Sequence, residues 1–160
     1  MILYHGTCHD FNKIDFSKFK DKRDFGKGFY TTTILEQAEK WAENQRLRYG
    51  KESAIVKCFE YKQNDNLKIK IFDEMSEEWL DFIKKCRTEG GTPHDYDIIQ
   101  GPVANDNTMR TIALYISGIY TTKQAIEQLK YFKVNNQISF HSEKVMLTLK
   151  WIEDREVKNV

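Results

Sequence analysis

The chain has 160 residues, of which 40% are hydrophobic and 31% are charged, as in a globular protein with a well-hydrated surface. This length predicts a single domain, covering residues 1–160, that can bury a hydrophobic core. The formal net charge of +1 gives no argument for a nucleic acid or a membrane surface as a partner. No stretch approaches the roughly 18 apolar residues that a membrane span needs. The first residues already read as a strand, which leaves no room for a signal peptide. We therefore expect a cytoplasmic protein with no membrane partner.

The three cysteines are Cys8, Cys58 and Cys86. Their number is odd, they lie far apart in the chain, and none belongs to a C-x-x-C pair. This pattern argues against a disulfide framework and against a zinc site, and it favours a reducing compartment. We expect no metal.

Hydrophobic patterning in the first half of the chain predicts strands at 2–5, 29–33, 54–61 and 67–72, and a helix at 34–49. The segment 8–24 is polar with scattered aromatic residues, which predicts an irregular loop. In the helix, apolar residues that include Ala38, Trp41 and Ala42 recur at helical spacing and form the expected core face. Gly50 is a typical stop signal after it.

In the second half we expect helices at 76–87, 107–117 and 122–131 and strands at 96–100 and 137–141. Ser76 and Thr122 are the expected N-caps of the first and third of these helices. Residues 145–152 fit either a helix or a strand, and a charged tail follows. Because strands and helices are mixed without a regular βαβ repeat, the expected fold class is α+β.

Two glycine-containing segments carry the clearest chemical pattern, namely Leu3-Tyr4-His5-Gly6-Thr7 and Asp24-Phe25-Gly26-Lys27-Gly28-Phe29-Tyr30-Thr31-Thr32. Glycine lets a backbone come close to a ligand. The Gly26-Lys27-Gly28 run precedes a strand and lacks the second half of a dinucleotide-binding fingerprint, and no P-loop sequence follows it. A nucleophile elbow of the form G-x-S-x-G is also missing from the sequence. We therefore expect neither a Rossmann or P-loop enzyme nor a serine hydrolase.

Together with Gln37-Ala38-x-x-Trp41-Ala42, Tyr96–Asn107 and Asn136–His141, these two segments resemble DUF3990, a bacterial family of unknown function. The resemblance runs from Leu3 to about Trp151. That family is in turn similar to the ADP-ribosyltransferases, in the branch of diphtheria toxin and the poly-ADP-ribose polymerases. There, three strands bring a His, a Tyr and a Glu to an NAD site. The resemblance implies an α+β fold with an ADP-ribosyltransferase-like split β-sheet and flanking helices.

Position by position, the resemblance places His5 at the His, Tyr30 at the Tyr and Gln137 at the Glu. It implies that the imidazole bonds the ribose hydroxyls and that the tyrosine ring stacks on nicotinamide. Gln137 can accept a hydrogen bond from the ribose 2′-hydroxyl. The other residues expected at the cofactor are Gly6, Thr7, Gly28, Phe29, Thr31 and Arg110.

Gln137 departs from the family pattern because it carries no charge to stabilise the oxocarbenium-like transition state. A replacement carboxylate is expected from Asp106, Asp97 or Glu143. Asp106 is favoured, because the turn at Gly101 and Pro102 can aim it inward, although it is equally suited to cap the following helix. Arg110, one helical turn later, can hold Asp106 or reach a pyrophosphate.

The resemblance implies an NAD-dependent ADP-ribosyltransferase that modifies an intracellular macromolecule, either protein or nucleic acid. Small proteins of this kind resemble toxins of toxin–antitoxin or phage-defence pairs, so an antitoxin or immunity protein is an expected partner. Two alternatives stay open: an NAD glycohydrolase, and a catalytically inactive module that binds a nucleotide or a protein.

Several of these residues also have structural interpretations. Trp41 and Trp79 lie at helical spacing with other apolar residues and are expected in the core. Lys27 is expected to be a solvated loop residue rather than a phosphate ligand. His141 and Glu143 are expected to lie at a strand end without a further role.

Overall fold

The computed structural model describes residues 1–104, 106–132 and 135–158, without the side chains of residues 106 and 107. Its strands are β1 (Ile2–Thr7), β2 (Phe29–Thr31), β3 (Ile55–Tyr61), β4 (Ile69–Ile71), β5 (Ile98–Gly101), β6 (Gln137–Phe140) and β7 (Leu149–Glu156). Its helices are α1 (Leu35–Tyr49), α2 (Glu77–Glu89), α3 (Asp106–Ile116) and α4 (Thr122–Leu129), with short 3-10 turns at Phe16–Lys18 and Glu143–Thr148. Among the described residues, no helix is both long and apolar enough to cross a membrane.

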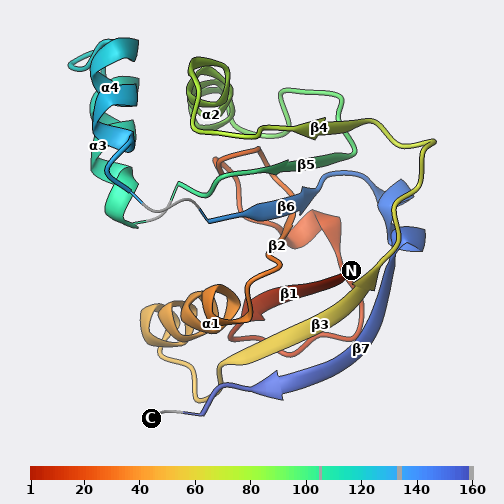
Figure 1. The fold of residues 1–160 in the computed structure, drawn as a ribbon. Helices are drawn as coiled ribbons and strands as arrows, with labels where there is room; N and C mark the ends of the chain where they lie inside the picture. Colours follow the sequence, from red (N-terminus) through yellow and green to blue (C-terminus); the bar gives the residue numbers. More distant parts are fainter. Residues whose placement is uncertain (105, 133–134, 159–160) are drawn as a thin grey trace.

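The strands form two sheets, one of three strands in the order β1-β3-β7 and one of four in the order β2-β6-β5-β4 (Figure 1). All neighbours are antiparallel except β4 and β5. Among the described residues, one isolated bridge joins the sheets, where Tyr4 and Thr32 exchange backbone hydrogen bonds of 2.8 and 2.9 Å. The predicted α+β class is therefore confirmed, and the bridge brings β1 and β2 side by side.

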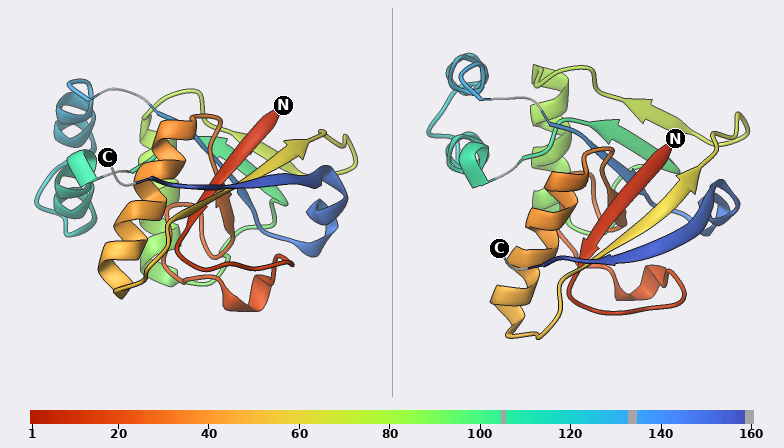
Figure 2. Two further views of the ribbon diagram at one scale, coloured as in Figure 1. Left: turned by 90° about the horizontal axis from the view of Figure 1, so that it is seen from below. Right: turned by 60° about the horizontal axis from the view of Figure 1, so that its bottom comes forward.

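The helices cover the two sheets separately. Helix α1 packs against β1 and β3 of the smaller sheet, whereas α2 lies over the larger one (Figure 1). Helices α3 and α4 pack on each other and form a hairpin at one end of the molecule, beside α2 (Figures 1 and 2). This arrangement leaves α1 at the junction of the sheets.

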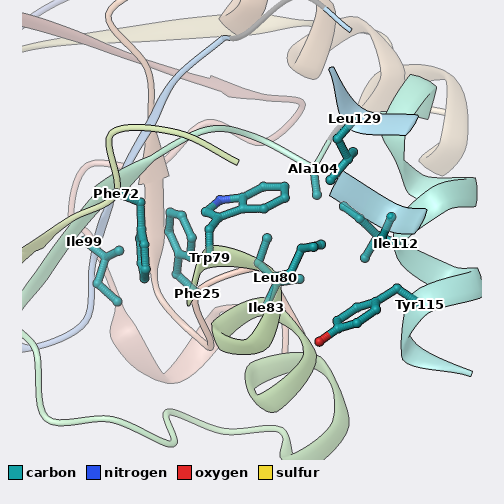
Figure 3. Packing of buried hydrophobic residues seen from close by; sticks show 11 residues of the cluster. Phe25, Phe72, Trp79, Leu80, Ile83, Ile99, Ala104, Ile112, Tyr115 and Leu129 are labelled. Carbon is teal, nitrogen blue, oxygen red and sulfur yellow. The ribbon is translucent and has the colours of Figure 1, made fainter. Parts of the chain in front are cut away.

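A core cluster around Trp79 fastens α2 to the larger sheet and to the loop before β2 (Figure 3). Trp79 is fully buried, as predicted, and its indole N–H donates to the carbonyl oxygen of Pro102 at 3.1 Å. Phe25 is also fully buried and stacks on Phe72, with ring centroids 5.8 Å apart. The aromatic ring of Phe25 thus fixes the glycine-containing loop in the core.

The observed bounds of the helices and strands mostly lie within two residues of the predicted ones, and two differences have an identifiable cause. The N-cap of α4 is Thr121 rather than Thr122, because the Thr121 hydroxyl and the Gln124 side chain bond each other's backbone N–H groups in a capping box. The charged tail expected after Ile152 is instead the second half of β7, which pairs with β3 as far as Glu156. Pairing with β3 stabilises this part of the strand, because the charged composition of the segment does not by itself favour a strand.

Candidate functional site

A cleft of about 610 Å³ opens where α1, the loop before β2 and the start of β6 meet. His5 of β1, Tyr30 of β2 and Gln137 of β6 all line it. The structure therefore brings together, from both sheets, the three side chains that the sequence singled out. The other lining residues are Gly6, Lys20, Arg23, Asp24, Ile34, Glu36, Gln37, Lys40, Trp41, Asn44, Gln45, Arg48, Arg87, Val103, Ala104, Phe132 and Asn135.

One ring nitrogen of His5 is hydrogen-bonded to the protein backbone. Its Nδ1 lies 2.7 Å from the carbonyl oxygen of Tyr30, and a carbonyl only accepts, so Nδ1 carries the proton. Burial lowers the pKa of His5 to about 4, which keeps the ring neutral at neutral pH. The ring stacks on Phe29 with centroids 4.2 Å apart. Nε2 is consequently a hydrogen-bond acceptor, and no described residue donates to it.

The Tyr30 hydroxyl holds the loop that precedes β2 in the chain. Its hydroxyl accepts from the N–H of Phe25 at 2.9 Å and donates to the carbonyl oxygen of Gly26 at 2.6 Å. Burial and the nearby charge of Asp24 raise the pKa of Tyr30 well above its usual value, so the phenol stays protonated. The hydroxyl is therefore used in hydrogen bonds to the protein backbone, and the ring is the part of Tyr30 that a ligand can contact.

Gln137 is buried and its amide has a fixed orientation. Nε2 donates to Asp24 Oδ2 at 3.0 Å and to the carbonyl oxygen of Pro102 at 3.2 Å. Because both partners are acceptors, the amide can be oriented only with its nitrogen toward them. Oε1 is left as the free acceptor of this side chain within the described part of the chain.

Asp24 is the carboxylate that adjoins Gln137, and sequence reasoning missed it. Only 6% of the residue is exposed, and it accepts from the Arg87 guanidinium, from the Ala104 N–H at 3.0 Å and from Gln137. Asp24 starts the loop that the sequence singled out, so its position in that motif was the available signal. A carboxylate therefore lies one hydrogen bond from Gln137, where it is paired with Arg87.

The three carboxylates expected at this position lie elsewhere or are not described. Asp97 is buried at the other end of β5, where it accepts from the backbone of Lys68 and from the Ser142 hydroxyl. Glu143 is exposed in the 3-10 turn before β7. Asp106 is the first residue of α3, and its side chain lies outside the described part of the structure. Neither Asp97 nor Glu143 lines the cleft.

Of the residues expected at the cofactor, Gly6 alone lines the cleft. A Cβ on Gly6 would lie 2.0 Å from the carbonyl oxygen of Ala38, so its glycine character is required by α1. Likewise, a Cβ on Gly28 would lie 2.6 Å from His141 Nδ1, so this glycine makes room for a protein side chain. The other four are placed away from the cleft: Phe29 and Thr31 are buried, Thr7 bonds the backbone of His9, and Arg110 is exposed on α3.

His141 was expected to have no role, but it clamps the loop between Asp24 and Gly28. Its Nδ1 donates to the carbonyl oxygen of Lys27 at 2.9 Å, and its Nε2 accepts from the Ser139 hydroxyl at 2.7 Å. The His94 ring packs edge-on against it and donates to the carbonyl oxygen of Phe25 at 2.7 Å. Two neutral histidines therefore hold this loop together with Tyr30, whose ring packs edge-to-face against His141 with centroids 6.1 Å apart.

Helix α1 turns a polar stripe toward the cleft. Gln37, Lys40, Asn44 and Arg48 all line it, at spacings of three or four residues that place them on one helix face. Trp41 lines it too and is half-buried, which corrects its expected place in the core. The buried residues of α1 are its small ones, Ala38 and Ala42, because the helix lies close against β1.

Two buried oxygens at the cleft have no hydrogen-bond donor among the described residues. They are Gln37 Oε1 and Asn135 Oδ1, and both residues line the cleft. Gln37 Nε2 is already bonded to the carbonyl oxygen of Asn136 at 2.8 Å, which fixes its orientation. A ligand with hydroxyl or amide N–H groups would satisfy these acceptors, whose desolvation otherwise costs about 1–3 kcal/mol each.

Acid should destabilise this protein between pH 6.5 and 4. Burial lowers the pKa values of His5 and His141 from the ordinary 6.5 to about 4, so the unfolded chain binds more protons in this interval. The histidine contribution is fully present above pH 6.5 and is lost as the pH falls toward 4. It amounts to at most about 3 kcal/mol for each residue.

Urea unfolding at a series of pH values measures this effect as the slope of the unfolding free energy against pH. The slope should decrease in His141→Gln and be unchanged in His9→Gln, since His9 is exposed. A wild-type slope of zero between pH 6.5 and 4 would contradict the neutral, buried state of these histidines.

Together these features define an α+β protein with two sheets, joined at one bridge, and a polar cleft beside that junction. The model of the family DUF3990, described as a protein of unknown function, matches residues 1–151. The chain therefore belongs to the DUF3990 family. No curated protein and no solved structure matches it.

Proposed function

We propose that this protein is an NAD-dependent ADP-ribosyltransferase with an ADP-ribosyltransferase-like split sheet. The observation that carries the proposal is the convergence of His5, Tyr30 and Gln137, from three strands of two sheets, on one cleft. These are the residue types that the transfer needs: a hydrogen-bonding imidazole, a flat aromatic ring and an acceptor near the anomeric carbon. The two orphaned oxygens of Gln37 and Asn135 fit a ligand rich in donors, as NAD is.

In this proposal, His5 Nε2 accepts from a ribose hydroxyl, because Nδ1 is bonded to the backbone. Gln137 Oε1 accepts from the 2′-hydroxyl, because Nε2 is held by Asp24 and Pro102. The ring of Tyr30 provides the stacking face for nicotinamide. Each group is held in position by the fold before a ligand binds, which lowers the cost of ordering it.

The reaction breaks the bond between the ribose anomeric carbon and the nicotinamide nitrogen, and nicotinamide leaves with the bonding electrons. Positive charge then develops on the ribose. Asp24, itself paired with Arg87, holds the Gln137 amide nitrogen, so that Oε1, the negative end of the amide dipole, is free to stabilise that cation. The acceptor nucleophile bonds to the anomeric carbon and releases its proton to water.

Incubation of the protein with NAD labelled in the adenylate part, in the presence of a cell extract, tests the proposal. We expect release of free nicotinamide together with label on a macromolecule. Free ADP-ribose without labelled macromolecule would instead make the protein an NAD glycohydrolase, with water as the acceptor. If NAD is neither bound nor cleaved, the proposed function is wrong.

His5→Asn is the sharpest variant, because the Asn amide can still donate to the Tyr30 carbonyl but has no counterpart of Nε2. We expect nicotinamide release to fall by at least about 100-fold, as for other single hydrogen bonds made in a transition state. His9→Asn is the matched control, since His9 is exposed and lies outside the cleft. Equal activity of the two variants would remove His5 from the site.

A further inference from the structure

The cleft carries an excess of positive charge. Within the described part of the chain, its lining includes five cations, Lys20, Arg23, Lys40, Arg48 and Arg87, but only two carboxylates, Asp24 and Glu36. Both carboxylates are already paired, Asp24 with Arg87 and Glu36 with Lys40. Among the described residues, no carboxylate lies within 4 Å of the three remaining cations.

These three cations, Lys20, Arg23 and Arg48, form what we call the cation rim. Lys20 and Arg23 come from the loop before β2, and Arg48 lies in the last turn of α1. Burial, followed by the charges of Arg23 and Arg48, lowers the pKa of Lys20, so both arginines lie within electrostatic reach of this lysine. Like charges held together without a counter-charge repel, and a bound anion removes that repulsion.

The cation rim extends outward from the proposed reaction site. At its inner end, the Arg23 guanidinium lies 5.9 Å from the centre of the Tyr30 ring. At its outer end, Lys20 Nζ lies 4.2 Å from the centre of the Tyr49 ring. The α1 stripe from Gln37 to Arg48 covers twelve residues, so its two ends lie about 16 Å apart at 1.5 Å per residue. This length accommodates a phosphate-linked nucleotide rather than a single small ion.

We propose that the cation rim binds phosphate groups of a nucleotide ligand that lies along the cleft. Arginine guanidinium groups match phosphate oxygens with paired N–H donors, and two of the three rim residues are arginines. The same chemistry fits the diphosphate of a free nucleotide and the backbone of a single-stranded nucleic acid that approaches as acceptor. The cleft position links this inference to the proposed function, but phosphate binding does not require that NAD is cleaved.

Calorimetric titration of the full chain with ADP, with adenosine and with a single-stranded oligodeoxynucleotide tests the inference. The test variant is Lys20→Gln/Arg23→Gln/Arg48→Gln. The matched control is Lys62→Gln/Lys123→Gln/Lys158→Gln, which removes the same three charges from exposed positions outside the cleft. Circular dichroism establishes that both variants are folded before they are titrated.

We expect ADP or the oligonucleotide to bind the wild type and the control alike, and the rim variant at least about tenfold more weakly. The wild-type affinity should fall with added salt. Whichever probe, ADP or the oligonucleotide, loses more affinity in the rim variant identifies the source of the phosphate. Equal losses in the two variants, equal affinities for ADP and adenosine with no oligonucleotide binding, or no binding of either phosphate probe would overturn the inference.

The outcomes separate this inference from the proposed function. Rim-dependent ADP binding without NAD cleavage keeps the phosphate site and rejects the enzyme. NAD cleavage that is equal in the rim variant and the control, together with unchanged phosphate binding, keeps the enzyme and rejects the rim.

Discussion

Asp24→Asn is expected to lower the free energy of unfolding by about 2–4 kcal/mol, as for removal of one member of a buried ion pair whose partner keeps some contact with water. The Asp24 carboxylate accepts from Arg87, Ala104 and Gln137, and it is 6% exposed. An Asn side chain offers a single oxygen to these donors. Its own NH₂ group would face another donor, so at least one buried donor loses its partner.

Urea unfolding at neutral pH measures this loss. Asp95→Asn is the control, because it removes a carboxylate that pairs with Lys68 at the solvent-exposed surface, where the ion pair contributes little. The two variants should differ clearly in unfolding midpoint. Equal midpoints would show that Asp24 does not hold the loop, α2 and β6 together.

Gln137→Glu refines the same test, because it places a second carboxylate against Asp24 Oδ2. Alone it should destabilise the protein, since two buried carboxylates cannot both stay charged at this distance. In the double variant Asp24→Asn/Gln137→Glu, one acid and one amide are again present. We expect the double variant to regain part of the unfolding free energy that the two single variants lose. In a double-mutant cycle of urea unfolding, this gain appears as a non-additive term.

Gly6→Ala is expected to destabilise the protein by about 3 kcal/mol or more, through overpacking against backbone atoms. The added Cβ would lie 2.0 Å from the Ala38 carbonyl oxygen and 2.8 Å from the Ala42 N. Neither atom belongs to a side chain that can rotate away, so α1 has to move off β1. The shift would also change the shape of the cleft, because the neighbouring face of α1 lines it.

Thermal unfolding followed by circular dichroism measures the change, with Gly50→Ala as the control. A Cβ on Gly50 meets nothing within 4 Å, so that substitution costs only the strain of its left-handed backbone, about 1 kcal/mol. If Gly6→Ala is no more destabilising than the control, the close packing of α1 on β1 is wrong.

Most helices and strands could be predicted from the sequence because their signals are local. Ser76 caps α2 as expected, since its hydroxyl accepts from the Trp79 N–H, and Gly50 ends α1 in the left-handed conformation. The far half of β7 could not be predicted, because its exposed, charged residues are ordered by pairing with β3. The division into two sheets likewise depends on which strands meet, and no local pattern encodes it.

The site was predictable only in part. His5, Tyr30 and Gln137 were found through a family resemblance, whereas their shared cleft required the fold. Asp24 was not predicted as a site residue because its partner Gln137 lies 113 residues away in the chain. Trp41 was assigned to the core because helical spacing does not distinguish a buried face from one that lines a cleft.

The most direct measurement of the central claim, that this cleft binds NAD, is tryptophan fluorescence during an NAD titration. Trp41 lines the cleft, whereas Trp79 is fully buried and Trp151 lies exposed on β7. We predict a saturable change in emission that is absent in Trp41→Phe, persists in Trp151→Phe and shifts to higher NAD concentration in His5→Asn. An emission that NAD leaves unchanged, or a change that Trp41→Phe and His5→Asn do not alter, would contradict an NAD site in this cleft.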